Sequence, residues 1–426
     1  MAICAGSRAP AGRWARAALA WALLSVLALV TAAEVAAEGR VGPERPRVAG
    51  SKAGAGEATE AQLDLIQQAL RTASPSLRAS LAAQLDRELG ARATAAAIPR
   101  SFRYRSVRGR IIESSAYDSH REPLPFYIIL PAGYDPGRPW PMHVYLHGGG
   151  FVSHRACRRF FRQEEIDGFI LLCPTTPKAH WWTPEGEEAV WEVVQEAARR
   201  VNVDTDRISL DGKSSGATGV WHLGHKFPWR WSALVTRCGG KIREPRFLTN
   251  LADTPTFMIH GDEDHTLPVD LSREMASLLK ARGMSFVYRE VRGGGHDFFP
   301  ALNAEVITWL ARQRRAIPRR FAFEPTRHQD HGIIHWLELS PASPLQARIE
   351  SDARGSVVSV STQEPPRSAT VYLNDALVDL DKPVRVVLNG AVVFEGVAAR
   401  STAVVLSSFA ETFDARRTFS AAIKAR

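Results

Sequence analysis

The sequence is poor in cysteine and has no pattern of metal ligands. Only four cysteines occur among 426 residues, which excludes a small domain held together by a disulfide framework. Cys4 lies before the apolar run of the amino terminus, so it is not placed for lipid attachment. Cys157, Cys173 and Cys238 allow one disulfide with one free thiol, or no disulfide. None of them has the spacing of a zinc site, and no metal is expected.

Beyond residue 33, the sequence also lacks a hydrophobic run that could cross a membrane. Arg8, Arg13 and Arg16 precede an apolar run over residues 17–33, and small residues follow. This order of segments is typical of a secretory signal peptide. We therefore expect residues 1–33 to be a signal peptide and the mature protein to be secreted or periplasmic, without stable membrane insertion. An uncleaved signal that anchors the protein is the alternative.

The charge pattern does not favour nucleic-acid binding. The chain has 54 Lys and Arg against 45 Asp and Glu, a formal net charge of +9. Its basic runs, such as residues 312–315 and 319–320, are short and scattered, and no basic helix is interleaved with aromatic residues. Such a pattern indicates a solvated, arginine-rich surface. We expect no nucleic-acid partner.

The first part of the mature chain has a helical pattern. Residues 34–56 are rich in Ala, Gly, Pro and charge, as in a flexible linker. Leucines at three-to-four spacing over residues 57–97, interrupted by Ser74-Pro75-Ser76, predict a helical hairpin. We expect this hairpin to pack against the domain that follows. A partner-binding or inhibitory arm is the alternative.

Strands and helices alternate over residues 101–317. Strands are expected at 125–130, 142–146, 169–172, 208–210, 233–235, 256–259 and 285–291, and helices at 186–200, 216–226, 270–282 and 301–314. Near-continuous apolar strands between helices predict an α/β domain, with a mostly parallel sheet covered on both faces.

The pattern changes again at residue 318. Residues 318–426 contain short segments in which apolar and polar residues alternate, separated by turn residues. The expected strands are 347–350, 357–360, 369–372, 384–388 and 392–394. Alternation with closely spaced turns predicts a small all-β domain, similar to a sandwich.

A serine lies between two glycines at a predicted strand-to-helix turn. The apolar pair Ile208 and Leu210 precedes Gly212-Lys-Ser214-Ser-Gly216, and small residues lead into a helix. This G-x-S-x-G pattern is typical of a nucleophile elbow, where a tight turn holds the serine hydroxyl above the sheet edge. We predict that Ser214 is a nucleophile.

A carboxylate and a histidine follow further predicted strands, in the order that a serine triad on such a sheet requires. Asp262, Glu263 and Asp264 follow the strand at 256–259. Asp264 is the predicted acid, because Asp262 is nearer the strand end and is expected to brace the turn. His296 follows three glycines after the strand at 285–291 and is the predicted base.

Other histidines are assigned different roles. His265 neighbours the predicted acid and is the second choice for the base. His260 is expected to be structural, because it stands beside a strand end. His222 and His225 are expected to pack or cap on the helix that follows Ser214.

Two more segments are candidate parts of the site. An oxyanion needs aimed N–H donors, and we expect them from Ser215, the residue after the nucleophile, and from Gly148 and Gly149. These glycines follow a predicted strand within His147-Gly-Gly-Gly150, an HGGG-type loop. Trp181 and Trp182 either line a substrate pocket or close the core against the helical hairpin.

These motifs resemble α/β-hydrolases related to polyhydroxybutyrate depolymerases and feruloyl esterases. That group borders the dienelactone hydrolase and prolyl oligopeptidase families. The resemblance covers roughly residues 120–315 and rests on four segments: 212–216, 147–150, 260–264 with Leu267-Pro268, and 295–297. It implies a triad of Ser214, Asp264 and His296 and no cofactor.

The chain departs from this resemblance at two places. Ala217-Thr218 stands where relatives commonly have a second glycine, and the small residue is expected to preserve the turn. Lys213 is unusual before the nucleophile and would favour substrates with an acidic group. The segments 377–384, 387–390 and 393–396 resemble a β domain at the end of some exported bacterial esterase-like proteins, which implies no particular role.

The sequence therefore predicts an exported serine hydrolase that cleaves carboxylic esters through an acyl-enzyme. Its substrate would be a small-molecule or polymeric ester, and the oligomeric state is left open. One alternative is a prolyl oligopeptidase-like peptidase, although no stretch is long enough for the propeller domain of those enzymes. Another is a polysaccharide-binding protein with an inactive hydrolase domain.

Overall fold

The computed structural model describes residues 57–72, 74–104, 111–149, 154–175, 180–326, 332–340, 345–352 and 355–425. The predicted signal peptide (1–33) and linker (34–56) lie outside these residues. Within the described ranges, no helix has both the length and the apolar character that a membrane span requires.

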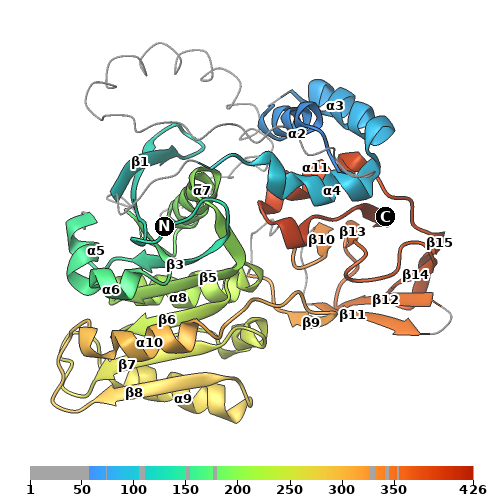
Figure 1. The fold of residues 1–426 in the computed structure, drawn as a ribbon. Coiled ribbons are helices and arrows are strands. Elements are labelled where there is room, and N and C mark those ends of the chain that lie inside the picture. Colours follow the sequence, from blue (N-terminus) through green and yellow to red (C-terminus); the bar gives the residue numbers. More distant parts are fainter. Residues whose placement is uncertain are drawn as a thin grey trace, which may run out of the picture.

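A mostly parallel sheet forms the centre of the larger domain (Figure 1). Its eight strands have the order β1-β2-β4-β3-β5-β6-β7-β8. Strand β2 is antiparallel to both its neighbours, and strands β3 to β8 are mutually parallel. The strands are β1 (Ile111–Tyr117), β2 (Pro123–Ile129), β3 (Trp140–Leu146), β4 (Ile170–Pro174), β5 (Val203–Lys213), β6 (Ala233–Arg237), β7 (Thr256–Gly261) and β8 (Phe286–Val291).

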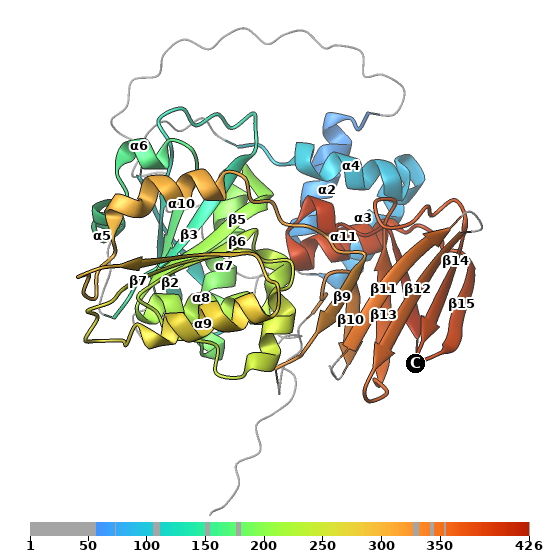
Figure 2. The same ribbon diagram turned by 90° about the horizontal axis from the view of Figure 1, so that it is seen from below.

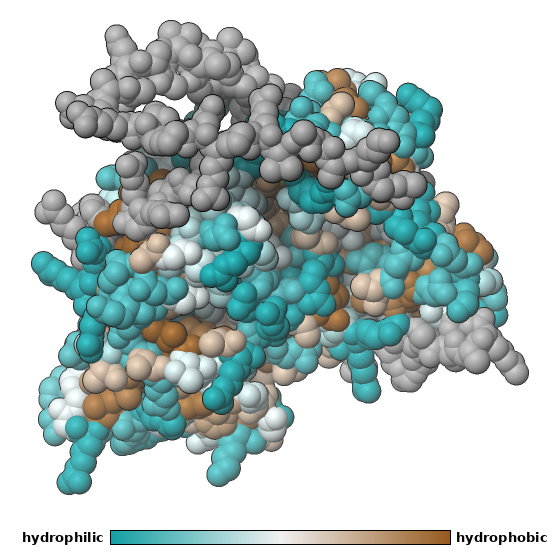
Figure 3. Space-filling view, in the orientation of Figure 1, coloured by the Kyte–Doolittle hydropathy of each residue, from teal (hydrophilic) through white to brown (hydrophobic). Residues whose placement is uncertain are grey.

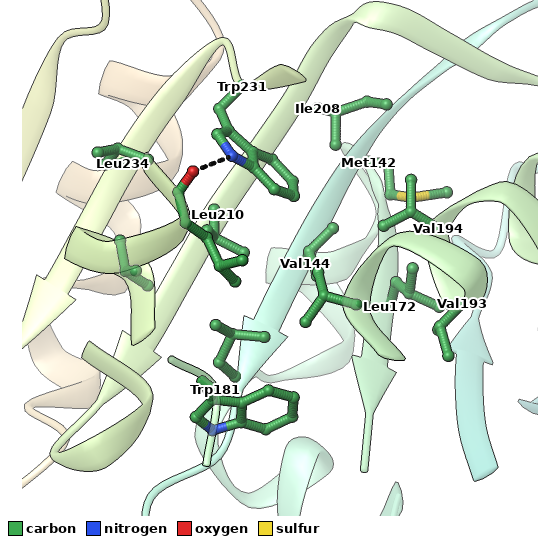
Figure 4. Close-up of a cluster of buried hydrophobic side chains, with 14 of the residues drawn as sticks. Met142, Val144, Leu172, Trp181, Val193, Val194, Ile208, Leu210, Trp231 and Leu234 are labelled. Atoms are coloured by element: carbon green, nitrogen blue, oxygen red, sulfur yellow. Dashed lines mark hydrogen bonds between the residues drawn. The ribbon is translucent and has the colours of Figure 1, made fainter. Parts of the chain in front are cut away.

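Helices cover both faces of this sheet, as the sequence predicts (Figure 2). On one face pack α7 (Pro184–Arg200), α8 (Ser215–Lys226) and α9 (Asp270–Ala281). On the other face pack α5 (His154–Phe160), α6 (Gln163–Ile166) and α10 (Asn303–Leu310). Figure 4 shows the first of these cores, where Val193 and Val194 of α7 meet Met142 and Val144 of β3.

The start of α7 shows how the local sequence sets a helix boundary. The Thr183 hydroxyl accepts a hydrogen bond from the Gly186 amide, Pro184 occupies the first turn, and Arg199 and Arg200 lie in the last turn. The threonine satisfies a free amide, and the proline has no amide that would need a partner. The arginines offset the negative end of the helix dipole.

The C-terminal region contains two small sheets. Strands β10 (Leu337–Ser340), β13 (Ser368–Leu373) and β16 (Ala421–Ala425) form one sheet. The other has the order β15 (Ala391–Val397), β14 (Pro383–Leu388), β12 (Gly355–Thr362), β11 (Leu345–Asp352) and β9 (Arg320–Phe323). Val358, Val371 and Trp336 share one buried core, so the two sheets pack together as the predicted sandwich-like arrangement requires.

The all-β prediction for this region misses one helix, α11 (Thr402–Thr412). Its sequence is rich in β-branched residues, which favour strands. The apolar side chains of Val405, Leu406 and Phe409 nevertheless recur at helical spacing and are buried. Tertiary packing therefore overrides the local preference.

The N-terminal segment forms three helices in place of the predicted hairpin: α2 (Glu60–Arg71), α3 (Pro75–Glu88) and α4 (Gly90–Ser101). Gly90, with a φ of 75°, allows the sharp change of direction between α3 and α4. The Ala-rich α4 has no leucine repeat, so the sequence pattern did not separate it from α3.

The partner of these helices also differs from the expectation. Ile66 of α2 and Leu85 of α3 share a core with Leu406 and Phe409 of α11, rather than with the large sheet. The side chain of Asp86 accepts hydrogen bonds from Thr402 at the start of α11. Helices α2 to α4 and α11, far apart in the sequence, therefore form one helical cluster.

Buried ion pairs join the large domain to the C-terminal region. The Arg315 guanidinium lies 2.9 Å from the Asp206 carboxylate and 2.5 Å from that of Asp414. The exposed Arg416 contacts the other carboxylate oxygen of Asp206, at 2.6 Å. Because Asp206 belongs to β5, this cluster lies at the far end of the strand that leads to Ser214.

Hydrophilic side chains cover most of the surface coloured in Figure 3, and apolar side chains occur there in separate groups. This appearance agrees with the solvated surface that the charge pattern predicts.

Candidate active site

Ser214 occupies a strained turn between β5 and α8. Its φ is 58° and its ψ is −121°, values that a non-glycine residue adopts only when the surrounding structure enforces them. A Cβ on Gly216 would lie 2.1 Å from the Leu146 carbonyl oxygen, and one on Gly212 would lie 2.5 Å from the Gly216 carbonyl carbon. Only glycine fits at both positions, as the G-x-S-x-G pattern predicts.

Asp264 and His296 are in direct contact. The Nδ1 atom of His296 lies 2.7 Å from Oδ2 of Asp264, and the other carboxylate oxygen accepts the backbone amides of Thr266 and Leu267. Burial raises the pKa of Asp264, but the bonds from the Leu267 amide, His296 and the Thr266 amide outweigh it and lower this pKa to about 2.

This contact selects one form of the imidazole. An ionised carboxylate only accepts hydrogen bonds, so Nδ1 of His296 must carry a proton. In the neutral ring, Nε2 then presents a lone pair, which is the form that a general base needs. The His296 side chain is 19% exposed.

Neighbouring acids and histidines have the supporting roles that the sequence predicts for them. The Asp262 carboxylate accepts the Gly293 amide at 2.6 Å and so braces the turn before His296. Both ring nitrogens of the buried His260 are engaged, one with the Ser272 hydroxyl and one with the Leu267 carbonyl. His265, the second choice for the base, is exposed, while the Asp264 carboxylate faces His296.

The chain brings the Ser214 turn and the His296 loop to the same sheet edge. Ser214 follows β5, Asp264 follows β7, and His296 follows β8, all at the carboxyl ends of parallel strands. The Ser214 amide donates to the Arg237 carbonyl at 2.9 Å. The thiol of Cys238, the next residue, donates to the Asp297 carbonyl at 3.4 Å. One short segment therefore touches both parts of the candidate site.

The glycine loop after β3 lies beside Ser214. A Cβ on Gly148 would be 3.4 Å from Cβ of Ser214. The Trp181 indole donates to the His147 carbonyl at 2.9 Å, and Nδ1 of His147 donates to the Gly148 carbonyl at 2.7 Å. Because N–H and C=O point in opposite directions across a trans peptide, these bonds turn the Gly148 and Gly149 amides away from Trp181 and His147.

Ser215 occupies the first position of α8. The first amides of a helix have no partner within the helix, so the Ser215 N–H is available beside the Ser214 hydroxyl. Burial lowers the pKa of His147 despite its bond to the Gly148 carbonyl. This histidine therefore stays neutral and supports the loop as a hydrogen-bond donor.

The two tryptophans have different environments. Trp181 is only 3% exposed and packs edge-on against His147, so it supports the glycine loop from within the core and does not line an open pocket. Trp182 is half-buried, and its ring stacks on that of His180 with centroids 4.6 Å apart. Trp182 also packs against the core of the large domain, so the structure places Trp181 within that core and Trp182 at its edge.

A buried ion pair beneath Ser214 was not anticipated from the sequence. Asp211 of β5 and Arg237 of β6 are both fully buried, and their charged groups approach to 3.0 Å. Arg237 also donates to the Phe298 carbonyl at 3.1 Å, and His143 lies 3.2 Å from Asp211. The sequence offered only a weak signal: Asp211 directly follows the segment 208–210 of β5, and Arg237 is the last residue of β6.

The cysteines are now assigned. Cys157 of α5 and Cys173 of β4 form a disulfide, and Cys238 is a buried free thiol, one of the two arrangements that the cysteine count allows. Burial raises the pKa of Cys238 to about 11, so the thiol is protonated. Among the described residues, Cys238, Asp264 and His296 form the one group of potential metal ligands. The Asp264–His296 hydrogen bond already occupies two of its atoms.

The strand order, with β2 antiparallel and a strained serine turn between β5 and α8, decides the fold class. The chain has the α/β-hydrolase fold. The positions of the acid after β7 and the histidine after β8 follow the order of that fold. The predicted fold class, an α/β-hydrolase sheet with an additional C-terminal β region, is confirmed.

No protein-family model and no curated protein sequence matches this chain. A thermostable esterase of known structure is 23% identical over 48% of this chain and 63% of its own, with a TM-score of 0.44. A putative dipeptidyl aminopeptidase IV from Bacteroides ovatus is 15% identical over 48% of this chain and 36% of its own, with a TM-score of 0.42. The chain thus spans less than two thirds of either protein.

A third α/β-hydrolase structure similar to part of the chain is a CE1 ferulic acid esterase from the anaerobic fungus Anaeromyces mucronatus. It is 16% identical over 50% of this chain and 94% of its own, with a TM-score of 0.38.

Proposed function

We propose that this α/β-hydrolase is a serine hydrolase that cleaves carboxylic esters through an acyl-enzyme. The observation that carries the proposal is the Asp264–His296 hydrogen bond of 2.7 Å, at the sheet edge where Ser214 occupies its strained turn. A serine hydroxyl is a weak nucleophile and needs such an oriented base. Strain at Ser214 has a purpose if its hydroxyl must face a substrate.

In the proposed reaction, the Ser214 oxygen attacks the ester carbonyl while Nε2 of His296 takes the hydroxyl proton. The oxyanion accepts hydrogen bonds from the amide of Ser215 and from those of Gly148 and Gly149. His296 then gives its proton to the departing alkoxide, and the alcohol leaves. Water repeats the sequence on the acyl-enzyme and releases the acid.

Two partly exposed features are proposed to contact the substrate. The stacked rings of His180 and Trp182 offer a flat surface on which a planar or extended group of an ester can lie. Lys213, half-buried beside Ser214, would attract an acidic group. A Trp182→Ala variant should therefore raise KM with a smaller effect on kcat.

We further propose that the protein acts outside the cytoplasm. The predicted signal peptide at residues 1–33 and the Cys157–Cys173 disulfide both support this, because disulfides persist mainly in oxidising compartments. The substrate would be a small-molecule or polymeric ester, with neither cofactor nor nucleic acid.

Labelling with a fluorophosphonate probe tests the proposal. The probe modifies an activated serine irrespective of the natural substrate. We expect labelling of the parent protein and its loss in both Ser214→Ala and His296→Ala. Ser277→Ala, which removes an exposed hydroxyl on α9, is the matched control and should be labelled normally. A folded parent that resists the probe would contradict the proposal.

Esters and amides with the same acyl group then separate an esterase from a peptidase. We expect ester turnover to exceed amide turnover. If amides were cleaved faster, the peptidase alternative would replace the esterase. If neither were cleaved and the probe failed, retention of the protein on polysaccharide matrices would test the binding alternative.

A further inference from the structure

We propose that Arg237 is a positioning residue that holds the Ser214 turn and the His296 loop at a fixed separation. This inference rests on the proposed serine hydrolase function. It concerns a residue that neither bonds to Asp264 nor belongs to the nucleophile motif. The backbone carbonyl of Arg237 binds the Ser214 turn, and its side chain binds the loop that follows His296.

The contacts of Arg237 reach three strands or loops. Its backbone carbonyl accepts the Ser214 amide at 2.9 Å. Its Nε and Nη2 atoms donate to Asp211, three residues before Ser214, over 3.0–3.2 Å. Its Nη1 atom donates to the carbonyl of Phe298, two residues after His296, at 3.1 Å.

The Phe298 end of this linkage is also packed. The Arg237 guanidinium carbon lies 4.0 Å from the centre of the Phe298 ring, and that ring is 1% exposed against Phe160 and Tyr145. Phe299, the next residue, has a φ of 56°. The loop after His296 is thus irregular backbone, and irregular backbone needs such side-chain bonds to keep one conformation.

Stability alone is a poor reason for burying this ion pair. Arg237 and Asp211 are each 0% exposed. Removing two charges from water costs several kcal/mol per ion, and neutral replacements of such pairs are often as stable. Burial raises the pKa of Asp211, but the charge of Arg237 and the bond to His143 outweigh this effect. The pKa of Asp211 is therefore below its ordinary value. The pair therefore stays charged, with a fixed and directional set of hydrogen bonds.

Such directional bonds matter because proton transfer depends on distance. A general base must come within about 2.6–3.2 Å of the hydroxyl that it deprotonates. A displacement of about 1 Å can reduce the rate roughly 100-fold. Arg237 constrains the distance from both sides, because it bonds the backbone of Ser214 directly and the His296 loop through Phe298.

The test compares the labelling kinetics of folded variants with a fluorophosphonate probe. Arg237→Met alone leaves a buried carboxylate without its partner, so it is made together with Asp211→Asn, which keeps a group for His143. We expect this double variant to melt near the parent temperature. Its maximal labelling rate should fall about 10- to 100-fold, while the probe concentration at half-maximal rate changes little.

Two further proteins complete the design. Arg237→Lys keeps the charge near Asp211 but cannot also reach Phe298, so its labelling rate should lie between those of the parent and the double variant. Asp206→Asn and Asp414→Asn with Arg315→Met remove a second buried Asp–Arg cluster, distant in the fold, without leaving a carboxylate unpaired. This control should be labelled at the parent rate, even if its melting temperature is lower.

The outcomes separate this inference from the proposed function. If the parent is not labelled, the proposed function itself fails. If the parent is labelled and the folded Arg237 variants react at the parent rate, only the positioning role is overturned. An equal loss of labelling in the Arg315 control would also overturn it, because any buried ion pair would then have the same effect.

Discussion

Replacing Asp264 by Asn should abolish the proposed hydrolase activity while leaving the fold intact. In the native protein, one carboxylate oxygen accepts the amides of Thr266 and Leu267, at 2.8 and 2.9 Å, and the other accepts Nδ1–H of His296. The two backbone amides require an oxygen, so the new side-chain amide must place its NH2 group toward His296. That NH2 group donates, and Nδ1 must then accept.

The consequence for His296 is the wrong tautomer. With Nδ1 as the acceptor, the neutral ring carries its proton on Nε2, which can no longer take a proton from Ser214. The corresponding Asp-to-Asn change in a serine protease lowers kcat about 10⁴-fold. We expect a loss of similar size in ester turnover and in the rate of probe labelling.

The matched control is Glu263→Gln, which changes an exposed carboxylate to an amide on the same loop. It should retain turnover within about threefold, as is usual for surface substitutions that alter no special contact. If Asp264→Asn also retained turnover to within tenfold of the parent, the assignment of Asp264 as the orienting acid would be wrong.

The pH dependence of stability gives an independent measure of the hydrogen bonds to the Asp264 carboxylate. The pKa of Asp264 falls from an ordinary 3.8 to about 2 in the folded protein, which corresponds to about 2 kcal/mol of stabilisation. Because the pKa is lowered, this stabilisation is complete above about pH 5 and is lost as the pH falls toward 2. In urea unfolding, the difference between the parent and Asp264→Asn should narrow by about 1 kcal/mol between pH 6 and pH 3.

Three further predictions concern the supports of the site and of the fold. Trp181→Phe keeps the ring packing but removes the hydrogen bond to the His147 carbonyl. In a steady-state assay, kcat should fall about 10-fold or more, as for a weakened oxyanion donor. An unchanged kcat would show that the glycine loop does not need this bond. Removing the Cys157–Cys173 disulfide, which spans 16 residues, should lower the free energy of unfolding by about 3 kcal/mol. Urea titration of a Cys157→Ser/Cys173→Ser variant measures this free energy, and a loss below about 1 kcal/mol would contradict the prediction. Phe409→Ala, at a position that is 4% exposed, should cost about 3–5 kcal/mol and reduce hydrogen-exchange protection in α2 to α4; protection lost only in the large sheet would refute the shared helical core.

The parts of the site that the sequence predicts well are those with local signals. The Ser214 turn needs small residues on both sides, because a Cβ on Gly212 or Gly216 would collide with backbone. Asp264 follows the buried strand β7 and His296 follows the partly apolar strand β8. Parallel strands place their carboxyl ends at one edge. Chain order and strand ends were therefore sufficient to bring Asp264 and His296 together.

The parts that the sequence could not predict depend on contacts between distant segments. Whether Trp181 faced a ligand or the core was undecidable from its neighbours, because the answer lies in its bond to the His147 carbonyl. The Asp211–Arg237 pair is formed across two strands, and neither residue has a distinctive local pattern. The strand-like composition of α11 is overridden by a core that it shares with helices from the other end of the chain.

The core shared by α2 to α4 and α11 also determines when the first helices can finish folding during synthesis. A ribosome synthesises α2, α3 and α4 long before α11, because Thr402, the start of α11, follows Ser101 by 301 positions. Until then, the apolar faces of the early helices lack their final partner, and contacts between such distant segments form slowly. Exposed apolar surface of this kind attracts chaperones or other nascent chains. A polypeptide that stops short of α11 would therefore have unprotected helices at its beginning, although every residue of the candidate active site is already present.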